Sequence, residues 1–141
     1  MTHDATVSTE LDLRLVVPGG PSLPVVTAVR YDAADPWAVR IAFRTGTEGS
    51  GVVEWLFARS LLIEGAVGPV GEGDVRVWPV QRGRGCVVHL AMASPSGSAV
   101  FELDRDELEQ FLRRTCAAVP VGRESAAVDL DAELAQLLSR S

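Results

Sequence analysis

The chain has 141 residues and a formal net charge of −6, and all thirteen of its basic residues are arginine. This length predicts one domain over residues 1–141, with a core large enough to need neither metal nor disulfide. The acidic balance and the absence of lysine disfavour binding to nucleic-acid phosphates, which needs a local excess of basic side chains. No apolar run is long enough for a membrane helix and no signal-peptide pattern is present, which predicts a cytoplasmic protein.

A regular first strand is predicted over residues 7–17. Its odd positions, from Val7 to Val17, are mostly apolar, and the even positions between them are mostly polar. This period of two is typical of a half-buried antiparallel strand. Neither proline nor lysine interrupts the pattern, so we expect a long exposed edge that tends to pair with another chain.

A second strand is expected at residues 25–31, and the next two strands form a hairpin around a glycine-rich turn at 46–51. Apolar side chains alternate along both arms of this hairpin. We therefore expect one buried aromatic face, made by Trp37, Val39, Ile41, Phe43, Val53, Trp55 and Phe57.

A short helix is expected at residues 58–64, closed by Gly65, and three more strands follow near 74–80, 86–93 and 99–103. The period then changes to that of helices. Asp104 followed by Glu107 resembles a capping box, and a last helix is expected to begin near Asp129 or Asp131. About seven strands followed by two helices predict an α+β fold, with mostly antiparallel sheets packed against a C-terminal helix–loop–helix.

The sequence offers no catalytic constellation, and we expect neither enzymatic activity nor a metal or cofactor. Cys86 and Cys116 are predicted to be free, packed thiols, and neither His3 nor His89 has partners at the spacing of a zinc site. The acidic residues at the two C-terminal helix starts fit helix capping, which needs no metal. The glycine-rich loops lack the Gly-Lys-Ser/Thr signature of a phosphate loop.

Trp78 is the aromatic residue that departs from the expected core pattern. It shares a strand face with Arg76 rather than with the apolar residues Val75 and Val77. Exposed tryptophan and arginine are favoured in interfaces, so Trp78 and Arg76 are the candidate protein-interface residues. Burial on both sides of a double-layered sheet would explain this pattern equally well, and a base-stacking role for the sheet aromatics is the other reading.

Several segments resemble the SsgA-like sporulation and cell-division proteins of actinobacteria, and most closely their SsgB branch. The segments that carry this resemblance are Asp35-Pro36-Trp37, Val53-Glu54-Trp55-Leu56-Phe57-Ala58-Arg59, Gly71-Glu72-Gly73-Asp74-Val75-Arg76-Val77-Trp78-Pro79, Phe111-Leu112-Arg113-Arg114-Thr115 and Val119-Pro120. The resemblance implies a fold similar to the whirly-type single-strand binders, a homo-oligomer with a trimer as the first expectation, and a non-enzymatic role. It also implies a protein that acts at the septum with an SsgA-type paralogue and recruits the division protein FtsZ.

Two functions therefore remain open at the level of sequence. The first is a protein-binding regulator that places FtsZ during sporulation-specific septation. The second is a single-stranded nucleic-acid-binding module that uses a whirly-like sheet face. Fold likeness alone does not decide between them, whereas net charge favours the first.

Overall fold

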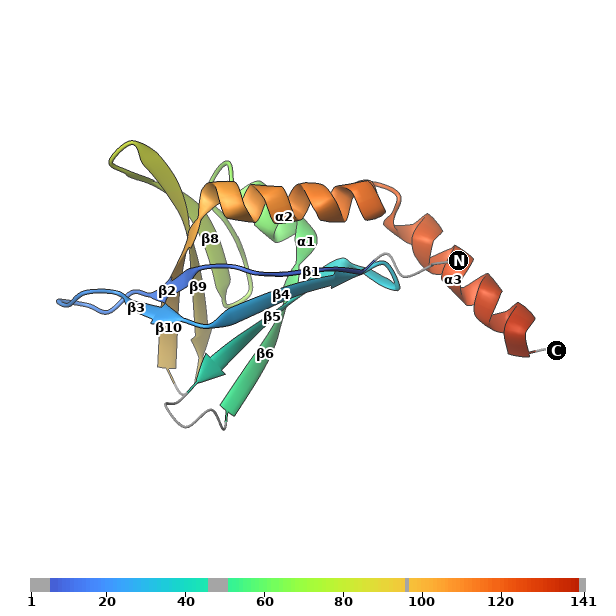
Figure 1. The fold of residues 1–141 in the computed structure, drawn as a ribbon, viewed down its shortest axis with the longest axis horizontal. Coiled ribbons are helices and arrows are strands. Elements are labelled where there is room, and N and C mark those ends of the chain that lie inside the picture. The colour runs from blue at the N-terminus through green and yellow to red at the C-terminus, as the bar shows by residue number, and fades with distance from the viewer. Residues whose placement is uncertain (1–5, 46–50, 96, 140–141) are drawn as a thin grey trace.

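The computed structural model describes residues 6–45, 51–95 and 97–139, which form two antiparallel sheets and three helices (Figure 1). The four-stranded sheet has the order β1 (Thr6–Glu10), β4 (Thr27–Asp32), β5 (Asp35–Thr45) and β6 (Gly51–Ala58). The six-stranded sheet has the order β3 (Leu23–Val25), β2 (Leu13–Leu15), β10 (Gly97–Asp104), β9 (Gly85–Ser94), β8 (Val75–Arg82) and β7 (Val70–Glu72).

The core lies between the two sheets. Phe43 of β5 stacks on Phe101 of β10 with ring centroids 4.6 Å apart, so inward side chains of the two sheets meet directly. Val39, Ile41, Val77 and Leu90 have no exposed surface. The predicted α+β fold with antiparallel sheets is confirmed, although the described residues contain ten strands rather than about seven.

Three helices, α1 (Arg59–Gly65), α2 (Arg105–Ala118) and α3 (Glu124–Ser139), complete the fold. Helix α2 packs across the body, whereas α3 extends away from the sheets after contacting β5 (Figure 1). The prediction that α3 starts near Asp129 or Asp131 is wrong. The helix begins at Glu124, directly after the non-helical segment at Pro120–Gly122 that ends α2. The side chains of Leu130 and Leu134 lie outside the described residues, as do residues 46–50 of the predicted turn.

The predicted first strand is two strands, and this corrects the single long edge expected at residues 7–17. The chain leaves the four-stranded sheet after Glu10 and enters the six-stranded sheet at Leu13. Leu11 and Leu13 are both buried, so the period of two continues through the crossing. The crossing is held by the carboxylate of Glu107, whose Oε1 accepts a hydrogen bond from the backbone N–H of Asp12 at 3.2 Å.

The β5–β6 hairpin is buried at one end only. Phe57 is buried as predicted, but Trp55 is half-buried and Val53 is 42 % exposed, which corrects their expected burial. Burial on the inward face of β6 therefore decreases from Phe57 toward the turn. Trp37 was also predicted to be buried and is 51 % exposed. The pairing of β4 with β5 shifts register between Tyr31 and Asp32, and this shift breaks the alternation before Val39.

Gly65 closes the short helix for a different reason from the one expected. It is the last residue of α1 and does not adopt a left-handed conformation. A Cβ atom at this position would collide with the side chain of Val77 on β8. The glycine therefore permits close approach of α1 to the six-stranded sheet, which is a packing role.

Replacing Gly65 by alanine is expected to destabilise the fold by about 1–3 kcal/mol, because overpacking against Val77 outweighs the better helix propensity of alanine. Urea denaturation measures this free energy. Gly68→Ala is the matched control, because a Cβ there meets no atom within 4 Å. Equal stability of the two variants would contradict the close approach of α1 to β8.

Candidate protein-interaction site

A buried arginine joins three separate segments at one end of the fold. Arg59, at the start of α1, is 1 % exposed. Its Nη1 donates to the carbonyl oxygens of Thr115 at 3.1 Å and Val119 at 2.7 Å, and its Nη2 donates to Glu124 Oε2 at 2.7 Å. The two carbonyls belong to the end of α2, where that of Thr115 also accepts from the N–H of Val119 at 2.8 Å and that of Val119 lies beyond the last helical residue. Arg59 thus caps α2 and fixes the start of α3.

Tyr31 completes this buried group. The Arg59 guanidinium lies 4.9 Å from the centre of the Tyr31 ring, and the Tyr31 hydroxyl donates to the carbonyl of Pro36 at 2.9 Å. Burial raises the pKa of Tyr31 to about 12, although the Arg59 charge opposes the shift. The hydrogen bond from Arg59 lowers the pKa of Glu124. The group is structural, because its donors and acceptors satisfy one another.

The outer face of the six-stranded sheet holds the sequence-predicted residues Trp78 and Arg76. Trp78 pairs across the strands with His89, and the two rings meet edge to face at 5.4 Å between centroids. Trp78 is consequently half-buried on this outer face, while Val77 is fully buried on the inner face. Arg76 is exposed on the same face as Trp78, as its alternation predicted.

Glu102 connects three strands beside Trp78. Its Oε2 lies 3.1 Å from His89 Nε2 and 2.8 Å from Arg82 Nη2. The side chains of Glu102 and His89 are only 15 % and 12 % exposed, whereas that of Arg82 is 55 % exposed, so the carboxylate has one enclosed partner and one partner at the surface. The arrangement supplies a firm backing for the Trp78 ring. It presents no nucleophile, and Cys86, although near His89 in sequence, faces the other way along β9.

A shallow hollow of about 440 Å³ opens beside Trp78 at the edge of the sheet. Its walls are largely apolar, and the stem of Arg76 lies over Gly71 of β7. The lining residues are Pro69, Val70, Gly71, Arg76, Val77 and Trp78. The hollow fits a partner protein that inserts an apolar side chain against Trp78 and places a carboxylate next to the guanidinium of Arg76.

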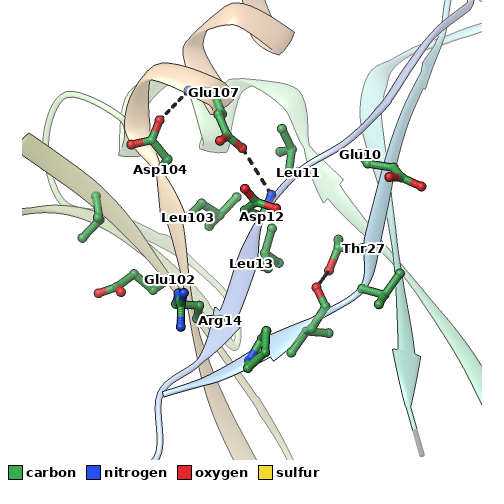
Figure 2. A pocket seen from close by; sticks show the side chains of 14 residues that line it. Glu10, Leu11, Asp12, Leu13, Arg14, Thr27, Glu102, Leu103, Asp104 and Glu107 are labelled. Carbon is green, nitrogen blue, oxygen red and sulfur yellow. Dashed lines mark hydrogen bonds between the residues drawn. The ribbon is translucent and has the colours of Figure 1, made fainter. Parts of the chain in front are cut away.

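A second, acidic groove of about 680 Å³ lies where the chain crosses between the sheets (Figure 2). Among the described residues that line it, Arg14 is the one cation, and five are carboxylates: Glu10, Asp12, Glu102, Asp104 and Glu107. Asp104 Oδ2 accepts from the N–H of Glu107 at 3.1 Å, which confirms the predicted helix cap. The Glu107 carboxylate does not complete the capping box, and instead accepts the hydrogen bond from the N–H of Asp12. The groove would repel a phosphate backbone.

Within the described part of the chain, no group of three or more His, Cys, Asp or Glu side chains is arranged to hold a metal ion. His3 lies outside this part. Cys86 and Cys116 are free thiols, as predicted, and both are half-buried rather than fully packed. In the same residue ranges, no helix is both long and apolar enough to span a bilayer.

Sequence reasoning missed the role of Arg59. It assigned the residue to a short helix and did not anticipate its burial or its partner Glu124. The sequence did contain a signal for this burial. Arg59 is the one charged residue in the run 56–62, which is otherwise apolar except for Ser60. A lone charge in an apolar run that cannot face solvent needs a buried partner.

A family model described as "Streptomyces sporulation and cell division protein, SsgA" matches residues 25–124. A "Sporulation-specific cell division protein SsgB" from Frankia casuarinae is 55 % identical over 136 residues, covering 96 % of this chain and 93 % of the relative. A protein of the same name from Streptomyces coelicolor is 52 % identical over 138 residues, covering 98 % of this chain and 99 % of the relative.

Two solved structures are also similar. One, from work on SsgB and longitudinal cell division during sporulation of Streptomyces coelicolor, has a TM-score of 0.83 and 50 % identity, covering 90 % of this chain and 98 % of the other. The second is an SsgA-like sporulation-specific cell division protein from Thermobifida fusca, with a TM-score of 0.87 and 41 % identity. It covers 96 % of this chain and 98 % of the other.

The buried position of Tyr31 predicts an anomalous alkaline titration. Tyr31 is the one tyrosine of the chain, so tyrosinate absorbance reports on this residue alone. We expect a midpoint near pH 12 in the folded protein and near 10 in denaturant. Because the folded pKa is raised, this contribution to stability is complete below pH 10 and is lost as the pH rises toward 12. Tryptophan circular dichroism shows whether the fold persists, and a midpoint near 10 with the fold intact would contradict the burial.

Proposed function

The chain belongs to the SsgA family of sporulation and cell division proteins, and we propose that it regulates sporulation-specific septation through protein–protein contacts that place or recruit FtsZ at septum sites. Its relatives are named as sporulation-specific cell division proteins, which supports a role in cell division during sporulation. The names point to no enzyme family, and the proposal assigns no reaction to the chain.

The hollow beside Trp78 is the observation that carries this proposal at the level of residues. Trp78 offers an aromatic wall that is already fixed by His89, so little ordering is needed when a partner docks. Arg76 adds an exposed guanidinium next to that wall. Fixed aromatic and arginine side chains are the residue types that dominate binding energy in protein interfaces.

The resemblance to SsgA-like proteins also implies other partners besides FtsZ. The chain would work at the septum beside an SsgA-type paralogue and as a homo-oligomer. Several copies of the Trp78 surface in one assembly would increase binding to a polymer such as FtsZ, because each further contact forms at a high effective concentration.

Replacing Trp78 by alanine or Arg76 by glutamate is expected to reduce co-sedimentation with FtsZ polymers at least tenfold, corresponding to about 1.4 kcal/mol or more of binding energy. Trp37→Ala is the matched aromatic control, because Trp37 is 51 % exposed outside the hollow. Arg30→Glu is the matched charge control on the other sheet. Wild-type co-sedimentation by all four variants would exclude the Trp78 surface, and failure of the wild-type protein to co-sediment would exclude direct recruitment.

The charge distribution also predicts weak binding to nucleic acid. Five carboxylates line the groove at the sheet crossing, and the net charge of the chain is −6. Random single strands should therefore bind more weakly than micromolar at about 0.15 M salt. Fluorescence anisotropy with labelled oligonucleotides measures this affinity, and submicromolar binding would favour the nucleic-acid module instead.

A further inference from the structure

Strand β7 forms one edge of the six-stranded sheet, and within the described residues it pairs with β8 alone. The carbonyl of Asp74, the residue before β8, accepts from the N–H of Ala93 on β9 at 3.0 Å. By the alternation of an antiparallel ladder, Val75 and Val77 therefore bond to β7. Their partners in β7 are the two residues that flank Gly71. Gly71 consequently directs its N–H and its carbonyl away from the sheet.

Two hollows flank this edge, one on each face of β7. The outer hollow is the one of about 440 Å³ beside Trp78 and Arg76. The inner hollow, of about 360 Å³, lies between β7 and α1, and its lining includes Glu64 and Glu72. Gly71 borders both hollows and is itself exposed. A strand added at this edge would therefore find a hollow on each of its two faces.

The two hollows carry opposite charges. Among the described residues that line the outer hollow, Arg76 is the one charged residue, whereas Glu64 and Glu72 are the charged residues of the inner hollow. All three residues are exposed. Successive side chains of a strand point to opposite faces. A partner strand therefore complements both hollows only if acidic and basic side chains alternate along it.

We propose that a partner protein adds an extended segment to the edge of β7, antiparallel to it, with side chains in the order basic, acidic, basic, apolar. This inference rests on the proposed function, because it describes how the partner that docks at Trp78 is held. Strand addition draws affinity from main-chain hydrogen bonds and selectivity from pockets for alternate side chains. Antiparallel pairing allows one residue of the partner to exchange both hydrogen bonds with Gly71.

The register of β7 with β8 assigns each position of this segment. The acidic residue lies opposite Gly71, where no side chain of β7 separates it from Arg76. Two residues later, on the same face, the apolar residue lies beside Pro69 and Trp78, which both line the outer hollow. The two basic residues lie on the other face, where the carboxylates of the inner hollow are exposed.

Two peptides test this order against the full chain. The first contains Arg-Asp-Arg-Leu, and the second contains Arg-Arg-Asp-Leu, which has the same composition and net charge but directs each middle side chain to the wrong face. We expect the first peptide to bind at least about tenfold more tightly, because the exchange brings like charges together on both faces. Nuclear magnetic resonance of the isotope-labelled protein measures both affinities. The amide of Gly71 should shift, and exchange more slowly with solvent, when the first peptide binds.

Variants of the edge separate the contribution of the backbone from that of the charges. Gly71→Pro removes the outward N–H, leaves the bonds to β8 intact, and should abolish the preference for the first peptide. Gly71→Ala keeps the N–H and should retain the preference, since its Cβ meets its nearest atoms at 3.4 Å. Glu64→Arg should reduce the preference, whereas Glu54→Arg, at an exposed carboxylate of the other sheet, should not. Far-ultraviolet circular dichroism confirms that each variant is folded.

Co-sedimentation with FtsZ distinguishes this inference from the proposed function. Strand addition predicts that Gly71→Pro reduces co-sedimentation as Trp78→Ala does. A loss with Trp78→Ala but not with folded Gly71→Pro would retain the proposed function and overturn strand addition. If the wild-type protein does not co-sediment, direct recruitment fails, and the peptide comparison by itself supports or overturns strand addition. Strand addition is also overturned if neither peptide binds, if the two bind equally, or if the Gly71 amide does not respond.

Discussion

The buried guanidinium of Arg59 is the contact on which the arrangement of the helices depends. It satisfies the last carbonyls of α2 and the first carboxylate of α3 while stacking on Tyr31 of the four-stranded sheet. Loss of these partners would leave the buried guanidinium of Arg59 uncompensated, which destabilises a fold. Arg59 also starts the helix that follows β6, so one side chain links the sheet, α1, α2 and the exit of α3.

Much of the fold could be predicted from the sequence in strands that bury one face and expose the other. Alternation correctly placed Val39, Ile41 and Phe43 inward, and Asp104 was correctly identified as a helix cap. The errors share one cause, since alternation predicts which face a residue occupies but not whether anything lies opposite it. Val53 faces inward yet is exposed, and Trp37 is displaced by a register shift. The crossing of the chain between the sheets at Leu11–Asp12 could not be predicted, because β1 and β2 continue the same alternation of apolar and polar residues.

The candidate site was predictable in position but not in surroundings. The face shared by Trp78 and Arg76 follows from strand parity, whereas the backing by His89 and Glu102 depends on which strands are neighbours. Two surfaces of different chemistry result: an aromatic and cationic hollow and an acidic groove. Glu102 belongs both to the backing of the hollow and to the lining of the groove, so these two surfaces adjoin each other on the six-stranded sheet.

The crossing of the N-terminal segment between the sheets constrains how the chain can fold. Because β2 is seated between β3 and β10, Leu13 must find Leu103 near the far end of the polypeptide. Contacts between residues so far apart in sequence slow folding, because the chain loses the entropy of loop closure before the pairing contributes favourable free energy. During synthesis the six-stranded sheet remains open until β10 has left the ribosome. The N-terminal strands therefore spend that interval exposed, and the protein acquires its surfaces together rather than one after another.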